Sequence, residues 1–292
     1  MKGIGGFYTV ETAEGMFVCR PRGIFRKEGL KPLTGDIVAI KPEPQGGGVI
    51  EDIFDRTTWL PRPPVANIDR LYIVSSCDKP KPDSYLIDRL AAAACSRGIE
   101  AVIVFNKSDL LVPADLPEVY RQAGFETFIV SCETGEGAQE LKNSLAGHVS
   151  CLAGNTGVGK SSILNLIFGS PILETGEISE KLGRGKHTTR QVELYKIAGG
   201  YVADTPGFAS IDYADINELT RENLAFYFIE FLPYLGRCKF TSCSHTGDEG
   251  CAVANAVKTG KIPDQRYANY CKIYQHITKN PGIRDNRDFK NK

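Results

Sequence analysis

The pattern of apolar and polar positions along the 292-residue chain changes twice, near residues 62 and 220. Up to about residue 62, short apolar runs are separated by Gly and Pro and show no helical period. Several short strands at regular spacing favour a small β-barrel, here of the OB-like type. The proline-rich stretch 60–64 is expected to be a linker. The expected strands are residues 5–10, 16–20, 36–40 and 48–53.

Between about residues 63 and 220, apolar runs of strand length alternate with stretches of helical period. This alternation predicts an α/β domain with a mainly parallel sheet and helices on both faces. The expected strands are residues 71–77, 101–105, 127–130, 150–153 and 201–203. The expected helices are residues 84–97, 137–146 and 160–168.

No strand is expected after about residue 220, where the pattern becomes helical. Residues 222–235 are apolar and aromatic at helical spacing, and two further helices are expected at 252–259 and 265–278. The last residues, 280–292, are polar and are expected to be frayed. The chain is therefore expected to have three domains, which are residues 1–62, 63–220 and 221–292.

A glycine-rich loop with the P-loop pattern GxxxxGKS lies between an expected strand and an expected helix. Glycines allow backbone N–H groups to surround phosphate oxygens, and the N-terminus of the following helix adds its positive dipole end. Lys160 is expected to reach the β- and γ-phosphates of a nucleotide, and Ser161 is expected to ligate Mg²⁺. The expected phosphate-binding residues are Gly154, Asn155, Thr156, Gly157, Val158, Gly159, Lys160, Ser161 and Ser162.

A second motif, Asn-Lys-Ser-Asp, follows the expected strand 101–105 and points to guanine. The Asp109 carboxylate can accept hydrogen bonds from both the ring N1–H and the exocyclic amine of guanine, a donor pair that adenine lacks. Asn106 and Lys107 can bracket the base and brace the P-loop. The serine and cysteine after the expected strand 127–130 fit a position where a backbone N–H contacts the guanine carbonyl. The expected base-binding residues are Asn106, Lys107, Ser108, Asp109, Ser131 and Cys132.

A third motif, Asp-Thr-Pro-Gly, fits the nucleotide switch of such proteins. Asp204 suits a role at Mg²⁺, and the Gly207 N–H suits a contact to the γ-phosphate. The loop 183–190 before it is basic and rich in glycine, and either Thr188 or Thr189 can close over Mg²⁺ there. This set of motifs predicts a GTPase.

The catalytic group is a separate question, because Phe208 stands where many small GTPases place a water-orienting glutamine. A phenyl ring cannot orient water. We hypothesise that His187, in the loop 183–190, takes the catalytic role when a partner orders that loop. Slow intrinsic hydrolysis is expected as a result.

The order of the motifs is unusual. Ordinary GTPases begin with the P-loop, whereas here the base motif 106–109 precedes the P-loop 154–161. A sheet whose chain ends lie close together can be permuted without changing its core. The order therefore indicates a circularly permuted GTPase.

Three of the nine cysteines cluster with one histidine near the C-terminus, and the other six are scattered. Three sulfurs and one imidazole form a closed tetrahedral zinc set, which indicates a structural role and one zinc per chain. Free thiols or a single disulfide are the alternative. Since no secretory signal is visible, the scattered cysteines are expected to be reduced in the cytoplasm. The expected zinc ligands are Cys238, Cys243, His245 and Cys251.

Bulk charge indicates no partner, because 35 basic and 35 acidic residues cancel. No apolar run approaches the roughly 20 residues needed to cross a bilayer, so no membrane partner is expected. Two local basic groups suit RNA, although a solvated basic loop is nearly as good an interpretation of the first. The first is Arg20, Arg22, Arg26, Lys27 and Lys31, beside Phe17 and Phe25. The second is Lys258, Lys261, Arg266, Lys272, Lys279, Arg284, Arg287, Lys290 and Lys292, with core-facing tyrosines among them.

Together these features resemble the circularly permuted family called ribosome small subunit-dependent GTPase A. The resemblance covers nearly the whole chain, including the barrel, the permuted motifs, His187-Thr188-Thr189 and the cysteine–histidine cluster. It implies binding to the small ribosomal subunit and its 16S rRNA, a late step in subunit maturation, and ribosome-stimulated hydrolysis of GTP. The expected protein is a cytoplasmic monomer that binds GTP and GDP.

Two other functions stay open at this point. One is a permuted GTPase of large-subunit assembly, although the N-terminal barrel and the C-terminal position of the zinc cluster count against it. The other is an RNA-binding module that holds GTP without turning it over, since Phe208 lacks the chemistry of a glutamine.

Overall fold

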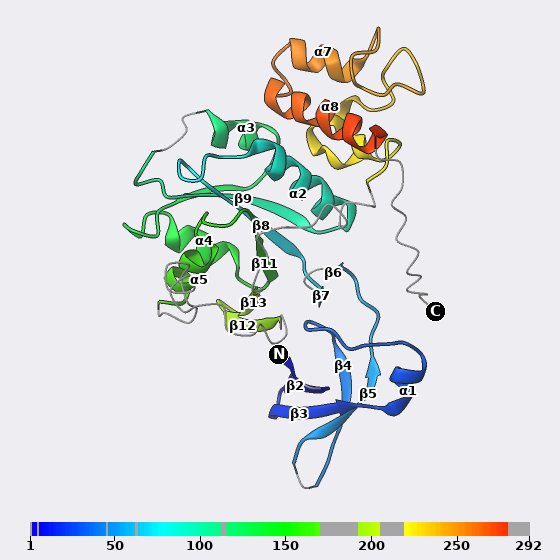
Figure 1. Ribbon diagram of the computed structural model, residues 1–292, viewed down its shortest axis with the longest axis vertical. Coiled ribbons are helices and arrows are strands. Elements are labelled where there is room, and N and C mark those ends of the chain that lie inside the picture. Colours follow the sequence, from blue (N-terminus) through cyan, green and yellow to red (C-terminus); the bar gives the residue numbers. More distant parts are fainter. Residues whose placement is uncertain are drawn as a thin grey trace.

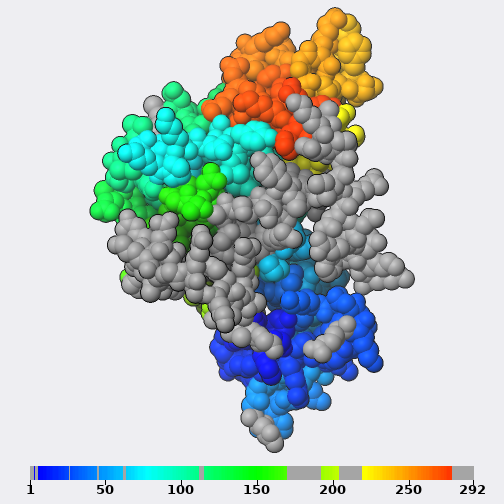
Figure 2. All heavy atoms as spheres, in the orientation of Figure 1, coloured from blue at the N-terminus to red at the C-terminus, as the bar shows by residue number. Residues whose placement is uncertain are grey.

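A computed structural model gives the fold of residues 2–4, 6–44, 46–61, 64–111, 115–169, 192–204 and 219–279. The chain forms three parts that follow one another along its longest axis (Figure 1). The space-filling view shows the N-terminal part as a lobe at one end and the C-terminal part as a lobe at the other (Figure 2).

The N-terminal part is a small barrel around the buried side chains of Val10, Cys19, Phe25 and Ile50. Its elements are β1 (Lys2–Ile4), β2 (Phe7–Thr12), β3 (Gly15–Pro21), α1 (Gly23–Lys27), β4 (Val38–Pro42) and β5 (Gly48–Ile53). The strands follow the order β1-β2-β3-β5-β4, in which β3 and β5 are parallel and the other neighbours are antiparallel. This is the expected OB-like architecture. Sequence analysis missed α1, because a helix of about one turn shows no period.

The described residues of the stretch 60–64, expected to be a linker, lie instead in two antiparallel strands, β6 (Trp59–Pro61) and β7 (Pro64–Ala66). Leu60 and Val65 are buried at the centre of this pair. Prolines lack the N–H that a ladder needs, but they are tolerated at strand ends and edges, which is where this pair of strands places them.

The central part is the expected α/β domain. Its strands are β8 (Arg70–Ser76), β9 (Glu100–Asn106), β10 (Thr127–Val130), β11 (Val149–Ala153), β12 (Glu193–Ile197) and β13 (Gly200–Asp204). Its helices are α2 (Ser84–Ser96), α3 (Leu116–Gln122), α4 (Ala138–Ser144) and α5 (Lys160–Phe168). The strands β10, β9, β8, β11 and β13 are parallel neighbours, whereas β12 pairs antiparallel with β13. Sequence analysis missed α3 and β12.

Side chains of β8 are buried on both faces of the sheet, as expected for a parallel strand covered by helices. Leu71 and Ile73 point into a core shared with α2 and α3. Tyr72 and Val74 point into a second core shared with α4 and α5. The central sheet is therefore fixed from both sides, and the carboxyl ends of its parallel strands are held in register.

The strands of the barrel and those of the central part belong to one continuous sheet. Eleven of the described strands form one sheet in the order β10-β9-β8-β11-β13-β12-β1-β2-β3-β5-β4, in which β1 pairs antiparallel with β12. The carboxylate of Glu11 in β2 accepts hydrogen bonds from Lys196 Nζ (2.7 Å) and from the Tyr201 hydroxyl (2.9 Å). These contacts join the barrel to the hairpin of β12 and β13.

The C-terminal part contains α7 (Ala252–Lys258), α8 (Asp264–Lys279) and the short 3₁₀ helices η2 (Leu224–Tyr227) and η3 (Ile229–Tyr234). The single helix expected over 222–235 is thus broken in two. Phe228 is extended there (φ −99°, ψ 91°), and Pro233 lacks the N–H of an α-helical bond. No helix in the described part of the chain has the length and apolar character that crossing a membrane requires.

Arg266 of α8, which the sequence analysis grouped with basic residues that suit RNA, is buried, with 1 % of its surface exposed. Its guanidinium forms a bidentate pair with Glu230 (2.7 and 3.0 Å) and a third bond to Asp88 of α2 (2.6 Å). Asn269 and Tyr120 also donate to the Asp88 carboxylate (2.7 and 2.9 Å). A buried polar network therefore joins the C-terminal part to α2.

Candidate functional site

The P-loop connects β11 to α5 in the way the sequence predicts, and two of its glycines are required by the fold. Gly154 has φ +139°, and a Cβ there would lie 2.1 Å from the Val74 carbonyl oxygen. Gly159 has φ +96°, and a Cβ there would lie 2.2 Å from Asn106 Nδ2. Any side chain at these positions would displace the neighbouring backbone or the neighbouring motif.

Lys160 lies at the start of α5 with its ammonium folded over the loop. Its Nζ donates to the carbonyl oxygens of Gly154 (2.8 Å) and Asn155 (2.9 Å). Burial lowers the pKa of Lys160 to about 8, because the charged form has lost part of its hydration. A phosphate in the loop would give this ammonium the anionic partner that the two neutral carbonyls do not provide.

The Asn-Lys-Ser-Asp motif contacts the P-loop from the end of β9. The amide of Asn106 is buried and donates to the Val158 carbonyl (2.9 Å). Lys107 Nζ donates to the Gly157 carbonyl (2.8 Å) and to the carbonyl of Lys79. The bracing that the sequence suggested for Asn106 and Lys107 is therefore present. No motif marks Lys79, because only its backbone takes part.

The serine after β10 closes the same site from the other side. The hydroxyl of Ser131 donates to Asp109 Oδ1 (2.5 Å) and accepts the backbone N–H groups of Glu133 (3.2 Å) and Thr134 (3.1 Å). The thiol of Cys132 donates to Asn106 Oδ1 at 3.4 Å. The two base-site loops are thus joined by contacts between protein side chains.

Several predicted residues are placed only in part. Asp204 ends β13, the parallel neighbour of β11, so its backbone lies at the P-loop edge of the sheet. His187, Thr188, Thr189 and Gly207 lie outside the residues that the structure describes.

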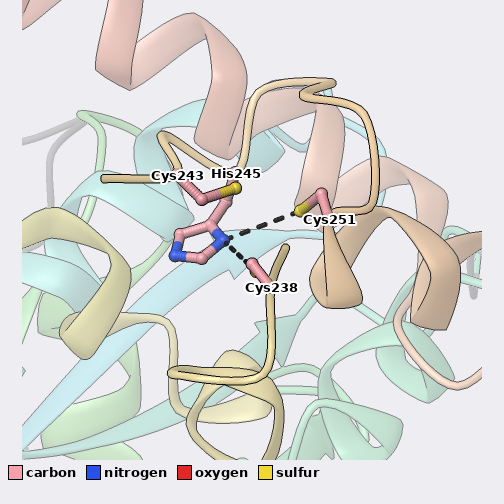
Figure 3. Close-up of side chains that lie close together, drawn as sticks. All are labelled: Cys238, Cys243, His245 and Cys251. Atoms are coloured by element: carbon pink, nitrogen blue, oxygen red, sulfur yellow. Dashed lines mark hydrogen bonds between the residues drawn. The ribbon is translucent and has the colours of Figure 1, made fainter. Parts of the chain in front are cut away.

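The three cysteines and the histidine of the C-terminal cluster converge, as Figure 3 shows. Their ligand atoms all lie within 4.8 Å of one another. His245 Nδ1 is 3.5 Å from Cys238 Sγ and 3.6 Å from Cys251 Sγ. His245 has a positive φ (58°), so the backbone turns to present the ring between the two sulfurs.

This donor set fits zinc. Bond lengths of about 2.3 Å for Zn–S and about 2.0 Å for Zn–N place sulfur and nitrogen about 3.5 Å apart in a tetrahedron, close to the distances found. Backbone N–H groups support two of the sulfurs, because Ala252 N lies 3.3 Å from Cys238 Sγ and Ala254 N lies 3.4 Å from Cys251 Sγ. Such donors stabilise thiolates.

The motifs, their contacts and their order in the chain define a circularly permuted GTPase. The sequence model of the RsgA GTPase family matches residues 53–214, and that of the RsgA N-terminal domain matches residues 1–50. The chain belongs to the RsgA GTPase family and is a GTP hydrolase.

Similar proteins cover nearly all of the chain. The small ribosomal subunit biogenesis GTPase RsgA of Moorella thermoacetica is 49% identical over 269 residues, which cover 91% of this chain and 92% of that protein. The protein of the same name from Caldanaerobacter subterraneus is 41% identical and covers 100% and 97%. YjeQ from Thermotoga maritima has a similar structure, with a TM-score of 0.81, 36% identity and coverage of 95% and 96%. YloQ, described as a circularly permuted GTPase, has a TM-score of 0.79, 30% identity and coverage of 96% and 93%.

Proposed function

We propose that this GTPase acts in the biogenesis of the small ribosomal subunit, by binding the subunit and leaving it after GTP hydrolysis. The observation that carries this proposal is the similarity to proteins named small ribosomal subunit biogenesis GTPase RsgA, which spans the barrel and the C-terminal part as well as the nucleotide domain. A relative that shared only the GTPase motifs would support GTP hydrolysis but not a ribosomal role.

GTP binds, in this proposal, across the carboxyl ends of β9, β10 and β11. The amides of residues 154–162 surround the phosphates, Lys160 neutralises their charge, and Asp109 accepts from the guanine ring and its amine. Ser161 is the expected ligand of the Mg²⁺ that accompanies the nucleotide, together with Asp204 and either Thr188 or Thr189. The Asn106 and Lys107 contacts to the P-loop support this assignment, because they hold the base site and the phosphate site together.

We further propose that hydrolysis is slow in the free protein and is stimulated by the small subunit. Phe208 cannot orient water, so another group must do so. His187 is our candidate, since it adjoins Thr188 and Thr189, and the Gly207 N–H is the candidate contact to the γ-phosphate. The free rate is then expected to lie in the unassisted range of roughly 10⁻⁴ to 10⁻³ per second.

The proposed domain limits are 1–62 for the barrel, 63–220 for the GTPase domain and 221–292 for the C-terminal part. The barrel and the C-terminal part are proposed to bind 16S rRNA. Exposed basic side chains on the barrel, such as Arg22 and Lys27, suit phosphate contacts. One zinc ion held by the Cys₃His cluster is proposed to stabilise the C-terminal part, where it would have no catalytic role because four protein ligands leave no open position. We take the working form to be a cytoplasmic monomer without a membrane partner.

The test is GTP hydrolysis by the purified chain alone, with small subunits, and with large subunits, combined with co-sedimentation. Stimulation and co-sedimentation with small subunits only are expected. Equal stimulation by large subunits would indicate a role in large-subunit assembly, and GTP binding without turnover in any mixture would indicate an RNA-binding module that only holds GTP.

Lys160→Ala should lose hydrolysis, whereas the control variant Lys142→Ala, in α4, should keep it. His187→Ala should keep subunit binding and lose most of the stimulation.

A further inference from the structure

The loop that carries Asp109 has a strained backbone, so its shape depends on what holds it. Lys107 has φ +66°, a left-handed conformation that costs a side chain about 1 kcal/mol or more. On one side, the Lys107 ammonium ties this loop to the P-loop through the Gly157 carbonyl. On the other side, the Ser108 N–H, one residue before Asp109, donates to the Val130 carbonyl (3.2 Å), and the Ser108 side chain makes a second contact.

That second contact comes from Glu136. The hydroxyl of Ser108, between Lys107 and Asp109, donates to Glu136 Oε2 at 3.0 Å. No motif of the base site includes Glu136, which lies five residues after Ser131 and is remote from the P-loop in sequence.

The backbone around Glu136 is fixed independently of this contact. The N–H of Ser131 donates to the Glu136 carbonyl (3.0 Å), and the N–H of Gly135 donates to the Ser131 carbonyl (2.9 Å), so the loop 131–136 closes on itself. Gly137 then has φ +69° and packs so tightly that a Cβ would lie 2.2 Å from the Ile129 carbonyl oxygen. The backbone of Glu136 is therefore held in place, and its exposed side chain reaches Ser108 from there.

We propose that Glu136 is a positioning residue for guanine recognition, which acts by fixing Ser108 and hence the angle at which Asp109 meets the base. The inference rests on the proposed guanine contact of Asp109. Ser131 binds the Asp109 carboxylate directly, and the Glu136–Ser108 link adds to the Ser108 N–H bond in fixing the backbone that carries it. The link matters most for the exocyclic amine of guanine, since accepting from two donors at once requires the carboxylate plane to match the base plane.

The test compares five variants in affinity for GDP and for inosine diphosphate, which has the ring N1–H but lacks the exocyclic amine. Glu136→Ala should weaken GDP binding about fivefold, the effect of one hydrogen bond of average net strength. Its affinity for inosine diphosphate should weaken less than about twofold, since inosine can make only one of the two contacts to Asp109. Ser108→Ala should behave alike, and the double variant should be no worse than either single one.

Glu136→Gln should bind GDP like the wild type, because the glutamine carbonyl can still accept from the Ser108 hydroxyl. Glu140→Ala, which removes an equal charge in α4 beyond the loop, is the matched control. In steady-state hydrolysis, Glu136→Ala should raise KM for GTP about fivefold and leave kcat unchanged, since uniform binding of the base is lost.

Two results would overturn the proposal. One is a Glu136→Ala variant that keeps the wild-type ratio of GDP to inosine diphosphate affinity, and the other is a Glu136→Gln variant as weak as Glu136→Ala. The function proposed above is tested separately by Asp109→Asn. If this variant leaves GDP affinity unchanged, Asp109 does not read the base at all, and the guanine assignment fails before Glu136 comes into question.

Discussion

Replacing Arg266 by methionine should destabilise the C-terminal part far more than an ordinary surface change. Methionine keeps most of the apolar stem but leaves the carboxylates of Asp88 and Glu230 without the cation that contacts both. Burial opposes the charge of Arg266, yet the two carboxylates outweigh this effect, so the pKa of its guanidinium is raised above the ordinary value. Removing one partner of such a buried pair costs about 3–5 kcal/mol.

That loss is large on the scale of this part of the protein. A folded region of about 60 residues has a net stability of roughly 3–9 kcal/mol. Arg266→Met therefore removes between a third and all of it. Adding Asp88→Asn and Glu230→Gln should recover much of the stability, because no carboxylate then stays charged and buried.

Hydrogen exchange followed by mass spectrometry resolves the effect by region. Amides of α8 and of the facing α2 should lose protection by about 10²-fold or more, since each 1.36 kcal/mol is a factor of ten. Amides of the barrel should keep their protection. The control variant Arg237→Met, which changes an exposed arginine of the C-terminal part, should be as protected as the wild type throughout. Wild-type protection of α8 in Arg266→Met would show that the network contributes no stability and that the reasoning is wrong.

Two further predictions concern the proposed metal and the P-loop. The purified protein should contain about one zinc per chain, and Cys243→Ser should lose the zinc and the stability of the C-terminal part but still bind nucleotide. The control variant Cys271→Ser should keep the metal. Elemental mass spectrometry measures the zinc content, and an unchanged content in Cys243→Ser would contradict the assignment. GDP binding should take up about half a proton at pH 8, because burial lowers the pKa of Lys160 to about 8 and an adjacent phosphate raises it, so affinity falls as pH rises above 8. Calorimetry in buffers of different ionisation enthalpy measures this uptake, and its absence at pH 8 would rule out the Lys160 titration.

The elements that sequence analysis missed share a physical reason. The helix α3 has seven residues, fewer than two turns, and so shows almost no periodicity. In β12, Leu194 and Ile197 are three residues apart, a helical spacing, and the strand state depends on pairing with β13. The turn between these strands uses Ala198 (φ 49°) and Gly199 (φ 76°), both of positive φ, as tight hairpins require. A small residue followed by glycine was the one local signal.

The sequence alone predicted more of the candidate site than of the network around Arg266. The P-loop and the zinc cluster are local, so their spacing alone predicts which atoms can meet. Arg266 meets Asp88 across 178 positions of the chain and Glu230 across 36, and no periodicity links residues so far apart. Its charge alone had placed it in a basic group suited to RNA, whereas the structure pairs it inside the protein.

The arrangement also explains what the permutation achieves. The base motif follows β9 and the P-loop follows β11, and these strands flank β8, so the site depends on sheet order and not on chain order. Moving the chain ends leaves the site intact, and the barrel and the C-terminal part then attach at the new ends of the GTPase domain. The barrel is joined to the β12–β13 hairpin, the strands that connect the segment of Thr188 and Thr189 to the segment of Asp204. The C-terminal part is joined to α2, which begins five residues after Lys79, whose carbonyl accepts a hydrogen bond from Lys107. Each flanking part thus contacts an element next to a nucleotide motif, as the proposed coupling between subunit binding and hydrolysis requires.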